Sequence, residues 1–273
     1  MARKINPSKK YVIALLWFIL TGSASSSPLH WLVYYGSEYK AEIFQKLDLA
    51  ILDPDNMIPP VNKGQTKYIA YLSVGEADKN RSYWNLIADQ KNLVESNPSW
   101  PGAYRVDIRS AVWQQLLLDK VIPEILKKGY DGLFLDNVDT PSYLEEKDAQ
   151  KFRGAKEAMV QFVKNLRKKY PQMEIYPNMG LNLLEKYGQE IDGVVVEDLY
   201  DPGYKKETPT REKQLDTFKR QFPNKPILNI IYDKSATPPF SPLALGAIQR
   251  SEKKGYDWYL TILDLMSTGW VRP

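Results

Sequence analysis

The sequence predicts an α/β protein that folds as a single-domain (β/α)₈ barrel. Eight short apolar or alternating segments, typical of strands, recur along the chain, and stretches with helical periodicity separate most of them. Alternation of strand and helix favours a parallel sheet, and a count of eight strands favours closure over an open sheet. Beyond its first 27 residues the chain keeps about 245 residues, the usual size of one such barrel.

The first 27 residues are predicted to be a secretory signal peptide. They begin with ten residues that carry four basic side chains and no acid, continue with ten largely apolar residues, and end in small polar ones. The apolar run is about half of the roughly 20 residues that span a bilayer, so a cleaved leader is favoured over a retained anchor. We expect cleavage after Ala24, Ser25 or Ser26, a barrel domain over residues 28–273, and a secreted or periplasmic protein without stable membrane insertion.

The strands and helices are expected to alternate along the whole mature chain. The expected strands are Trp31–Tyr35, Leu49–Asp53, Lys67–Val74, Gly132–Asp136, Glu174–Asn178, Gly193–Glu197, Pro226–Tyr232 and Trp258–Asp264. The expected helices are Ala41–Lys46, Tyr83–Leu93, Val112–Lys128, Ala149–Tyr170, Leu183–Tyr187, Arg211–Phe222 and Pro242–Lys254, several of them followed at once by glycine or proline. No linker rich in glycine, serine or proline indicates a second domain.

The composition narrows the chemistry. The chain has no cysteine and a single histidine, His30, which excludes thiol nucleophiles, disulfides and metal sites built from several imidazoles. His30 is expected to be structural, because it precedes the first strand and so lies at the end of the barrel away from catalysis. Without the four basic residues of the leader, 33 Lys and Arg balance 33 Asp and Glu, so neither nucleic acid nor an anionic membrane is an expected partner. Carboxylates are therefore the expected acid–base groups of any active site.

Two of the predicted strands end in carboxylates. Asp136 and Asp139 follow one strand, and Glu197 and Asp198 follow another. Because residues at the C-terminal ends of barrel strands line the active site, both strands can deliver a carboxylate to one pocket. Paired carboxylates are what glycoside hydrolysis requires, so Asp136 and Glu197 are the candidate catalytic residues.

The other C-terminal strand ends are polar as well, whereas the N-terminal ends are mostly apolar, glycine or proline. The candidate substrate-binding residues are Tyr35, Asp53, Glu76, Asp139, Asn178, Tyr200 and Tyr232. Several have simpler explanations: Asp53 and Asp139 can cap turns or helices, and Asp136 and Glu197 can form buried ion pairs. The neighbouring strands, however, supply no obvious inward cation.

A metal site is the other open alternative. Asp136, Asp139, Glu76 and Asp78 could form an all-oxygen calcium or magnesium site, which needs no histidine. The spacing does not match an EF-hand, so we expect neither a metal nor another cofactor.

Six stretches along the chain carry a resemblance to a known family: Leu49–Pro54, Ala70–Asp78, Tyr104–Arg109, Gly132–Asp139, Pro177–Asn178 and Val196–Glu197. In this order they resemble glycoside hydrolase family 114, the endo-α-1,4-polygalactosaminidases and related proteins. The form of residues 71–78 is closer to the bacterial and archaeal branch than to the fungal enzymes. The resemblance implies a TIM barrel, export, and hydrolysis of a galactosamine-containing polysaccharide, with Asp136 and Glu197 on the two catalytic carboxylates of the family.

The sequence therefore predicts a secreted glycoside hydrolase whose partner is a polysaccharide, with a cationic amino-sugar polymer as one candidate. Glu197 is expected to be the general acid/base and Asp136 the nucleophile. The alternative is a carbohydrate-binding barrel that keeps the cleft without turnover.

Overall fold

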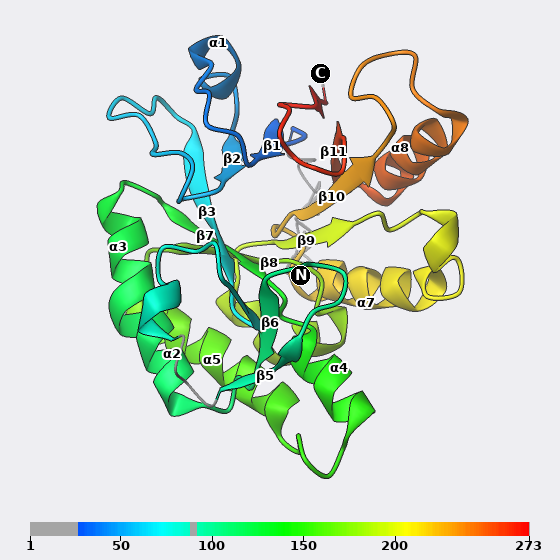
Figure 1. Ribbon diagram of the computed structural model, residues 1–273. Coiled ribbons are helices and arrows are strands. Elements are labelled where there is room, and N and C mark those ends of the chain that lie inside the picture. The colour runs from blue at the N-terminus through cyan, green and yellow to red at the C-terminus, as the bar shows by residue number, and fades with distance from the viewer. Residues whose placement is uncertain (1–26, 88–91, 273) are drawn as a thin grey trace, which may run out of the picture.

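Eight parallel strands form the centre of the protein. The computed structural model describes residues 27–87 and 92–272. The strands are β1 (Trp31–Tyr34), β2 (Leu49–Leu52), β3 (Lys67–Ser73), β7 (Gly132–Asp136), β8 (Glu174–Pro177), β9 (Val194–Glu197), β10 (Ile227–Tyr232) and β11 (Asp257–Thr261). They pair in that order within two sheets, and an isolated parallel bridge between Asn178 and Val195 joins β8 to β9. All eight expected strands are present and the predicted (β/α)₈ class is confirmed (Figure 1).

The barrel closes between β11 and β1 mainly through side chains. The Tyr259 hydroxyl donates to the carbonyl oxygen of Val33 over 3.1 Å, and the rings of Trp31 and Tyr259 lie 5.6 Å apart. One backbone hydrogen bond follows beyond the strand ends, from the nitrogen of Tyr35 to the oxygen of Leu265. A short antiparallel strand, β12 (Trp270–Val271), continues the sheet on β11.

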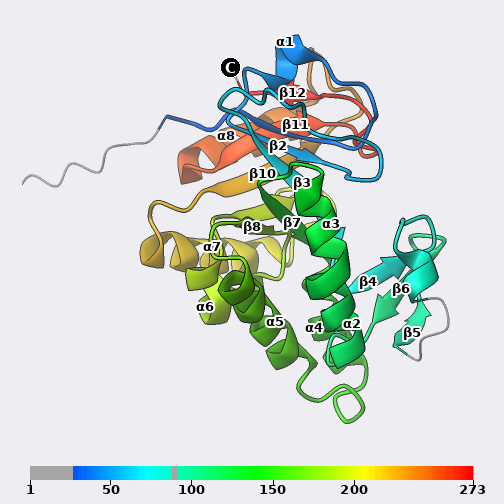
Figure 2. The same cartoon turned by 90° about the vertical axis from the view of Figure 1, so that its left-hand side faces the viewer.

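The helices lie outside the barrel (Figures 1 and 2). They are α1 (Ala41–Phe44), α2 (Ala111–Leu116), α3 (Ile122–Lys127), α4 (Thr140–Lys147), α5 (Ala155–Lys169), α6 (Leu184–Tyr187), α7 (Thr208–Gln221) and α8 (Pro242–Lys254). Helix α5 buries Met159, Val163 and Leu166, a spacing of three and four residues that puts one apolar face on the strands. Helix α8 ends at Gly255, whose φ of +66° suits a glycine at a helix C-terminus.

The connection between β3 and β7 differs from the prediction. It contains a small antiparallel sheet of β4 (Glu76–Asp78), β6 (Ala103–Val106) and β5 (Leu93–Ser96), which stands apart from the barrel in Figure 2. The predicted helix Tyr83–Leu93 is wrong, because its described part has only a 3₁₀ turn at Trp84–Leu86 and Leu93 already belongs to β5. Trp84 of this segment packs on Tyr104 of β6 at 5.7 Å, whereas Tyr83 packs on Trp113 of α2.

Two further boundaries changed. Helix α4 is absent from the expected helices, and α5 starts at Ala155 rather than at Ala149. The predicted signal peptide lies almost wholly outside the described residues. Within the described ranges, no helix combines the length and the apolar character that a membrane span requires.

Candidate active site

The two candidate catalytic carboxylates end strands that lie on either side of β8. Asp136 is the last residue of β7 and Glu197 the last of β9. Asn178 follows β8 directly, and its Nδ2 donates to Oδ1 of Asp136 over 3.1 Å and to Oε1 of Glu197 over 2.5 Å. Because these bonds of 3.1 Å and 2.5 Å meet at one nitrogen, the two oxygens lie no more than 5.6 Å apart, their combined length. The structure thus brings Asp136, Asn178 and Glu197 together.

The remaining carboxylate oxygens also have donors. The Tyr71 hydroxyl donates to Oδ2 of Asp136 over 2.9 Å, and the backbone nitrogen of Asn137 donates to Oδ1 of the same residue. The Tyr232 hydroxyl donates to Oε2 of Glu197 over 2.8 Å. Hydrogen bonds therefore fix the positions of all four carboxylate oxygens.

Strained backbone surrounds the pair. Asn137, Met179 and Asp198, which follow the ends of β7, β8 and β9, have φ values of 59°, 57° and 44°. Such left-handed conformations cost non-glycine residues about 1–3 kcal/mol each and cluster at functional sites. Hydrogen bonds hold two of them: Ser73 donates to the side chain of Asn137, and the Tyr232 nitrogen donates to the carboxylate of Asp198.

The surroundings change the acidity of Glu197. Burial raises the pKa of Glu197 to about 7, and the nearby Asp136 charge acts in the same direction, while the hydrogen bonds from Tyr232 and Asn178 lower it. Burial also raises the pKa of Asp198 to about 6. Glu197 can therefore hold or release a proton near neutral pH.

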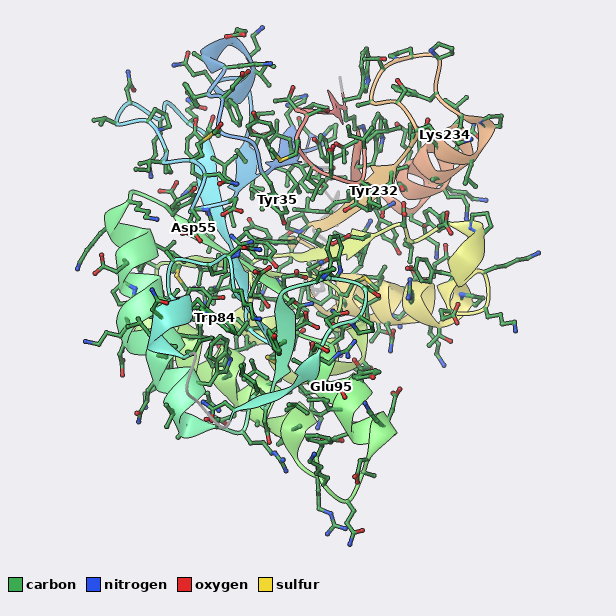
Figure 3. All side chains as sticks on the ribbon, viewed as in Figure 1. Tyr35, Asp55, Trp84, Glu95, Tyr232 and Lys234 are labelled. Carbon is green, nitrogen blue, oxygen red and sulfur yellow. The ribbon has the colours of Figure 1, made fainter. Side chains whose placement is uncertain are left out.

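Three more of the predicted residues border this group. The rings of Tyr35 and Tyr71 pack edge to face with their centres 5.3 Å apart, and burial followed by the Asp136 and Glu197 charges raises the pKa of Tyr35. Figure 3 shows Tyr35 and Tyr232 near each other at the barrel, whereas Trp84 and Glu95 lie on the small sheet away from them. Asp139 is exposed to solvent, yet the surrounding protein and the Asp136 charge raise its pKa.

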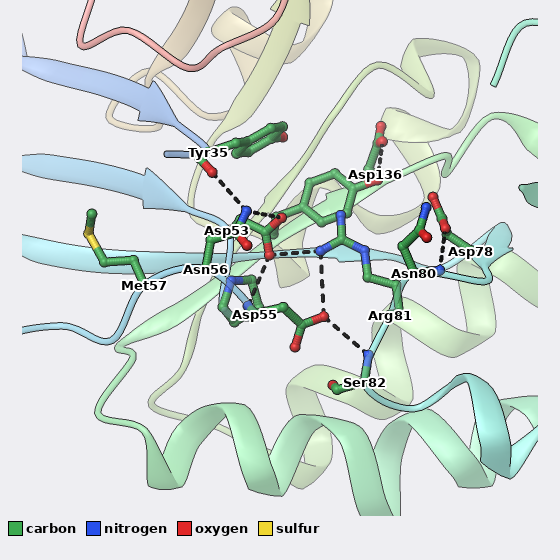
Figure 4. A network of polar contacts seen from close by, with 12 residues as sticks. Tyr35, Asp53, Asp55, Asn56, Met57, Asp78, Asn80, Arg81, Ser82 and Asp136 are labelled. Atoms are coloured by element: carbon green, nitrogen blue, oxygen red, sulfur yellow. Dashed lines mark hydrogen bonds and ion pairs between the residues drawn. The ribbon is translucent and has the colours of Figure 1, made fainter. Parts of the chain in front are cut away.

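Asp53 does not contact the central pair directly. Its Oδ1 accepts a 2.7 Å hydrogen bond from Nη1 of Arg81, and the Arg81 guanidinium lies 4.6 Å from the centre of the Tyr71 ring (Figure 4). Arg81 comes from the loop after β4 and not from a barrel strand, so the sequence does not indicate that this cation points inward.

Glu76 and Tyr200 do not join the carboxylate pair. Glu76 is buried and accepts hydrogen bonds of 3.0 and 3.1 Å from the Asn97 amide, with Arg105 at 3.7 Å. The ring of Tyr200 lies under the guanidinium of Arg250 on α8, 4.2 Å away. The expected substrate-binding role of these two residues therefore has no support in their contacts.

The described residues contain no group of three or more His, Cys, Asp or Glu side chains arranged as a metal site. The alternative metal site of Glu76, Asp78, Asp136 and Asp139 is therefore not supported. The Glu76 carboxylate already bonds to the Asn97 amide and pairs with Arg105.

The sequence profile of glycoside-hydrolase family GH114 matches residues 22–272. The chain belongs to this family. Its curated relatives include an uncharacterized protein of Methanocaldococcus jannaschii, 30% identical over 225 residues that make up 75% of this chain and 64% of the relative. Another, from Thermotoga maritima, is 26% identical over 72% of this chain and 65% of its own length. The chain thus spans less than two thirds of these relatives. The resemblance found in the sequence is confirmed.

Two solved structures of GH114 proteins have the same fold. The glycoside hydrolase domain of PelA from Pseudomonas aeruginosa matches with a TM-score of 0.73 and 23% identity, over 89% of this chain and 98% of that one. Ega3 from Aspergillus fumigatus, in complex with galactosamine, matches with a TM-score of 0.66 and 19% identity, over 90% and 94%.

Proposed function

We propose that this GH114 protein hydrolyses a polysaccharide with Asp136 and Glu197 as its two catalytic carboxylates. The observation that carries the proposal is the Asn178 amide, which donates to both carboxylates at once. A bridging amide fixes the distance and the relative orientation of the two acids before any substrate arrives, and such preorganisation lowers the barrier of the reaction.

The distance between the carboxylates supports a retaining mechanism. In retaining glycosidases the two groups are about 5–5.5 Å apart, and in inverting enzymes about 6.5–9.5 Å, because a water molecule must fit between acid and sugar. The oxygens bonded to Asn178 lie no more than 5.6 Å apart, the combined length of bonds of 3.1 Å and 2.5 Å. In the first step Asp136 bonds to the anomeric carbon while Glu197 protonates the leaving oxygen. In the second, Glu197 takes a proton from water, whose oxygen displaces Asp136.

The environment of each acid supports the assignment of roles. A general acid must carry a proton at the working pH, and burial together with the Asp136 charge raises the pKa of Glu197 to about 7. Asp136 accepts hydrogen bonds from Tyr71, Asn178 and its neighbour Asn137, which aim its oxygens at one place as a nucleophile requires.

The negative charge at this end of the barrel favours a cationic amino-sugar polymer as the substrate. Asp136 and the exposed Asp139 lie at one end of the barrel, where their negative charges attract an ammonium group. Tyr35 and Tyr232, both half-buried, add aromatic side chains beside the two carboxylates that could contact a sugar ring. The galactosamine in the Ega3 structure is in line with this class of sugar. Cleavage within the chain of a galactosamine-containing polysaccharide, outside the cytoplasm, is the activity that we infer.

The decisive experiment is incubation with partially deacetylated galactosaminogalactan and other amino-polysaccharides. Mass spectrometry should detect oligosaccharide products, and NMR at early times should find the same anomer in the product as in the substrate. Inverted product would contradict the double-displacement mechanism. Binding of the polymer without any turnover would favour the non-catalytic barrel instead.

The products that alanine variants form with added azide distinguish the nucleophile from the general acid/base. If Glu197→Ala removes the acid/base, azide attacks the covalent intermediate and the glycosyl azide retains configuration. If Asp136→Ala removes the nucleophile, azide attacks the substrate directly and the product is inverted. The opposite pairing of variant and product would exchange the two assignments.

A further inference from the structure

A chain of contacts reaches Asp136 from the side away from Asn178. It runs from Asp53 through Arg81 to the ring of Tyr71, whose hydroxyl bonds to Asp136 (Figure 4). We propose that Arg81 is a positioning residue that holds Tyr71 against Asp136 and strengthens the hydrogen bond between them. The proposal rests on the proposed function, because it assigns Arg81 a part in orienting the nucleophile.

Tyr71 is held from several sides. Its hydroxyl lies 2.9 Å from Oδ2 of Asp136, and the centre of its ring lies 5.3 Å from that of Tyr35 and 6.1 Å from that of Phe134. Burial and the Asp136 charge raise the pKa of Tyr71 well above its usual range, so the phenol keeps its proton and always acts as the donor. The orientation of this ring therefore decides where Oδ2 of Asp136 points.

Arg81 is held just as firmly. Its Nη1 bonds to Asp53 at 2.7 Å and lies 3.7 Å from Asp55, and the side chains of Arg81 and Asp53 are only 18% and 10% exposed. Ion pairs that are shielded from solvent are screened little by salt, unlike pairs on an open surface. The guanidinium over the Tyr71 ring thus has a fixed position.

The loop after β2, which carries Asp53, also holds Tyr35, the second aromatic neighbour of the site. Asn56 donates to the backbone oxygen of Tyr35 over 2.9 Å and lies 3.4 Å from the Asp53 carboxylate. Asp53 accepts a further hydrogen bond from the backbone nitrogen of Asp55. The sequence predicts that Asp53 binds substrate. Its contacts indicate instead that it holds Arg81 directly and the Tyr35 backbone through Asn56.

A guanidinium above a phenol ring has two effects. It is attracted to the ring face, which restricts rotation of the side chain. Its charge also stabilises negative charge on the phenol oxygen, so Arg81 acts to lower the Tyr71 pKa against the larger effect of burial. A more acidic phenol donates a stronger hydrogen bond to Asp136. Both effects act on Asp136 only through Tyr71.

The test is a double-mutant cycle with Arg81→Met, Tyr71→Phe and the double variant. Each single change should lower kcat by roughly tenfold to a hundredfold with little change in KM, since a misplacement of about 1 Å can cost a hundredfold. The double variant should be no slower than Tyr71→Phe alone. Arg81→Lys should restore part of the rate, because an ammonium keeps the charge but lacks the planar guanidinium.

Arg250→Met is the matched control. Arg250 also pairs with an acid, Glu212, at 3.2 Å and also covers a tyrosine ring, that of Tyr200, at 4.2 Å, but it belongs to α8, outside the barrel. Its removal should leave kcat at the wild-type value. Equal losses in Arg250→Met and Arg81→Met would mean that both act through general stability.

Whether the wild type is active distinguishes failure of the proposed function from failure of the proposed role of Arg81. If the wild type cleaves the polymer but Arg81→Met is as fast, or if the two changes multiply in the double variant, the role of Arg81 is wrong and the proposed function stands. If the wild type cleaves nothing, crystal structures still decide. The Tyr71 hydroxyl should move out of hydrogen-bond distance from Asp136 in Arg81→Met, and an unchanged contact would overturn the proposal.

Discussion

Asn178 donates its side-chain amide to Glu197 at the place where its own backbone forms the isolated bridge between β8 and β9. The next residue, Met179, donates its backbone nitrogen to the oxygen of Val195 on β9. The two sheets of the barrel therefore meet at the candidate catalytic pair. The residue that joins the two sheets also sets the spacing of the acids.

Replacement of Asn178 by alanine should harm both rate and stability. We expect kcat to fall by roughly tenfold to a hundredfold, because both carboxylates lose a common donor. The free energy of unfolding should fall by about 1–3 kcal/mol, the cost of leaving buried polar groups unsatisfied. Asn182→Ala is the control, since Asn182 bonds only to the Ser142 hydroxyl in the described structure. Wild-type kcat in Asn178→Ala would contradict the bridging role.

Neutralising either acid should stop catalysis without unfolding the barrel. Asp136→Asn and Glu197→Gln should each lower kcat by at least roughly a hundredfold. Because the folded pKa of Glu197 is about 7, above its value in the unfolded chain, the ionised group destabilises the fold increasingly as pH rises from about 4.5 through 7.

The thermal midpoint of Glu197→Gln should therefore lie above that of the wild type at pH 8 and equal it near pH 4. The corresponding gain in the free energy of unfolding at pH 8 is at most about 3 kcal/mol. Asp136→Asn should be as stable as wild type or slightly more so, because it relieves repulsion between like charges. Near-wild-type turnover in either variant, or loss of the fold in both, would show that these carboxylates are structural.

The sequence could predict the strand ends but not the contacts made between them. Unbroken apolar runs located β7 and β9, and their final residues placed Asp136 and Glu197 at one end of the barrel. Asn178 was predicted to bind substrate, whereas it bonds to both carboxylates, because its partners come from strands 42 and 19 residues away.

The insertion after β3 was harder to predict for a physical reason. Its apolar residues have a spacing that suits either a helix or a strand, and only tertiary packing decides between them, as for Trp84 on Tyr104. Arg81 lies within this insertion, so its approach to Tyr71 could not be inferred without the fold. Long-range partners of this kind carry no periodic signal.

Chelation should leave the rate nearly unchanged. The proposed reaction uses only proton transfer and a carboxylate nucleophile, so no step requires a cation. The measurement is turnover before and after extensive dialysis against a chelator. Activity that is lost and then restored by calcium or magnesium would assign Asp136 and Asp139 to a metal site.

The N-terminus of the exported protein should lie between Ser25 and Ser27. This prediction rests on the basic, apolar and small-polar sections of the first 27 residues. N-terminal sequencing of protein recovered outside the cytoplasm checks it. An intact Met1 on membrane-bound material would refute cleavage.

The pH profile should report the protonation of Glu197. As the general acid it must be protonated, and its pKa is raised to about 7, so kcat/KM should fall as pH rises above about 7. Tyr232 donates to the Glu197 carboxylate and so stabilises its charged form. Tyr232→Phe should raise the pKa of Glu197 and move the basic limb of the profile to higher pH, by on the order of one unit for a charge-assisted hydrogen bond of about 1.5 kcal/mol.

Tyr176→Phe provides a matched comparison for this shift. The Tyr176 hydroxyl donates to Glu174 over 2.8 Å, the same distance as Tyr232 to Glu197, but Glu174 begins β8 and lies at the opposite end of the barrel. Loss of that hydrogen bond leaves Glu197 untouched, so the basic limb should stay in place. A basic limb that moves equally in both variants, or that moves to lower pH in Tyr232→Phe, would mean that another group controls the profile and that Glu197 is not the general acid.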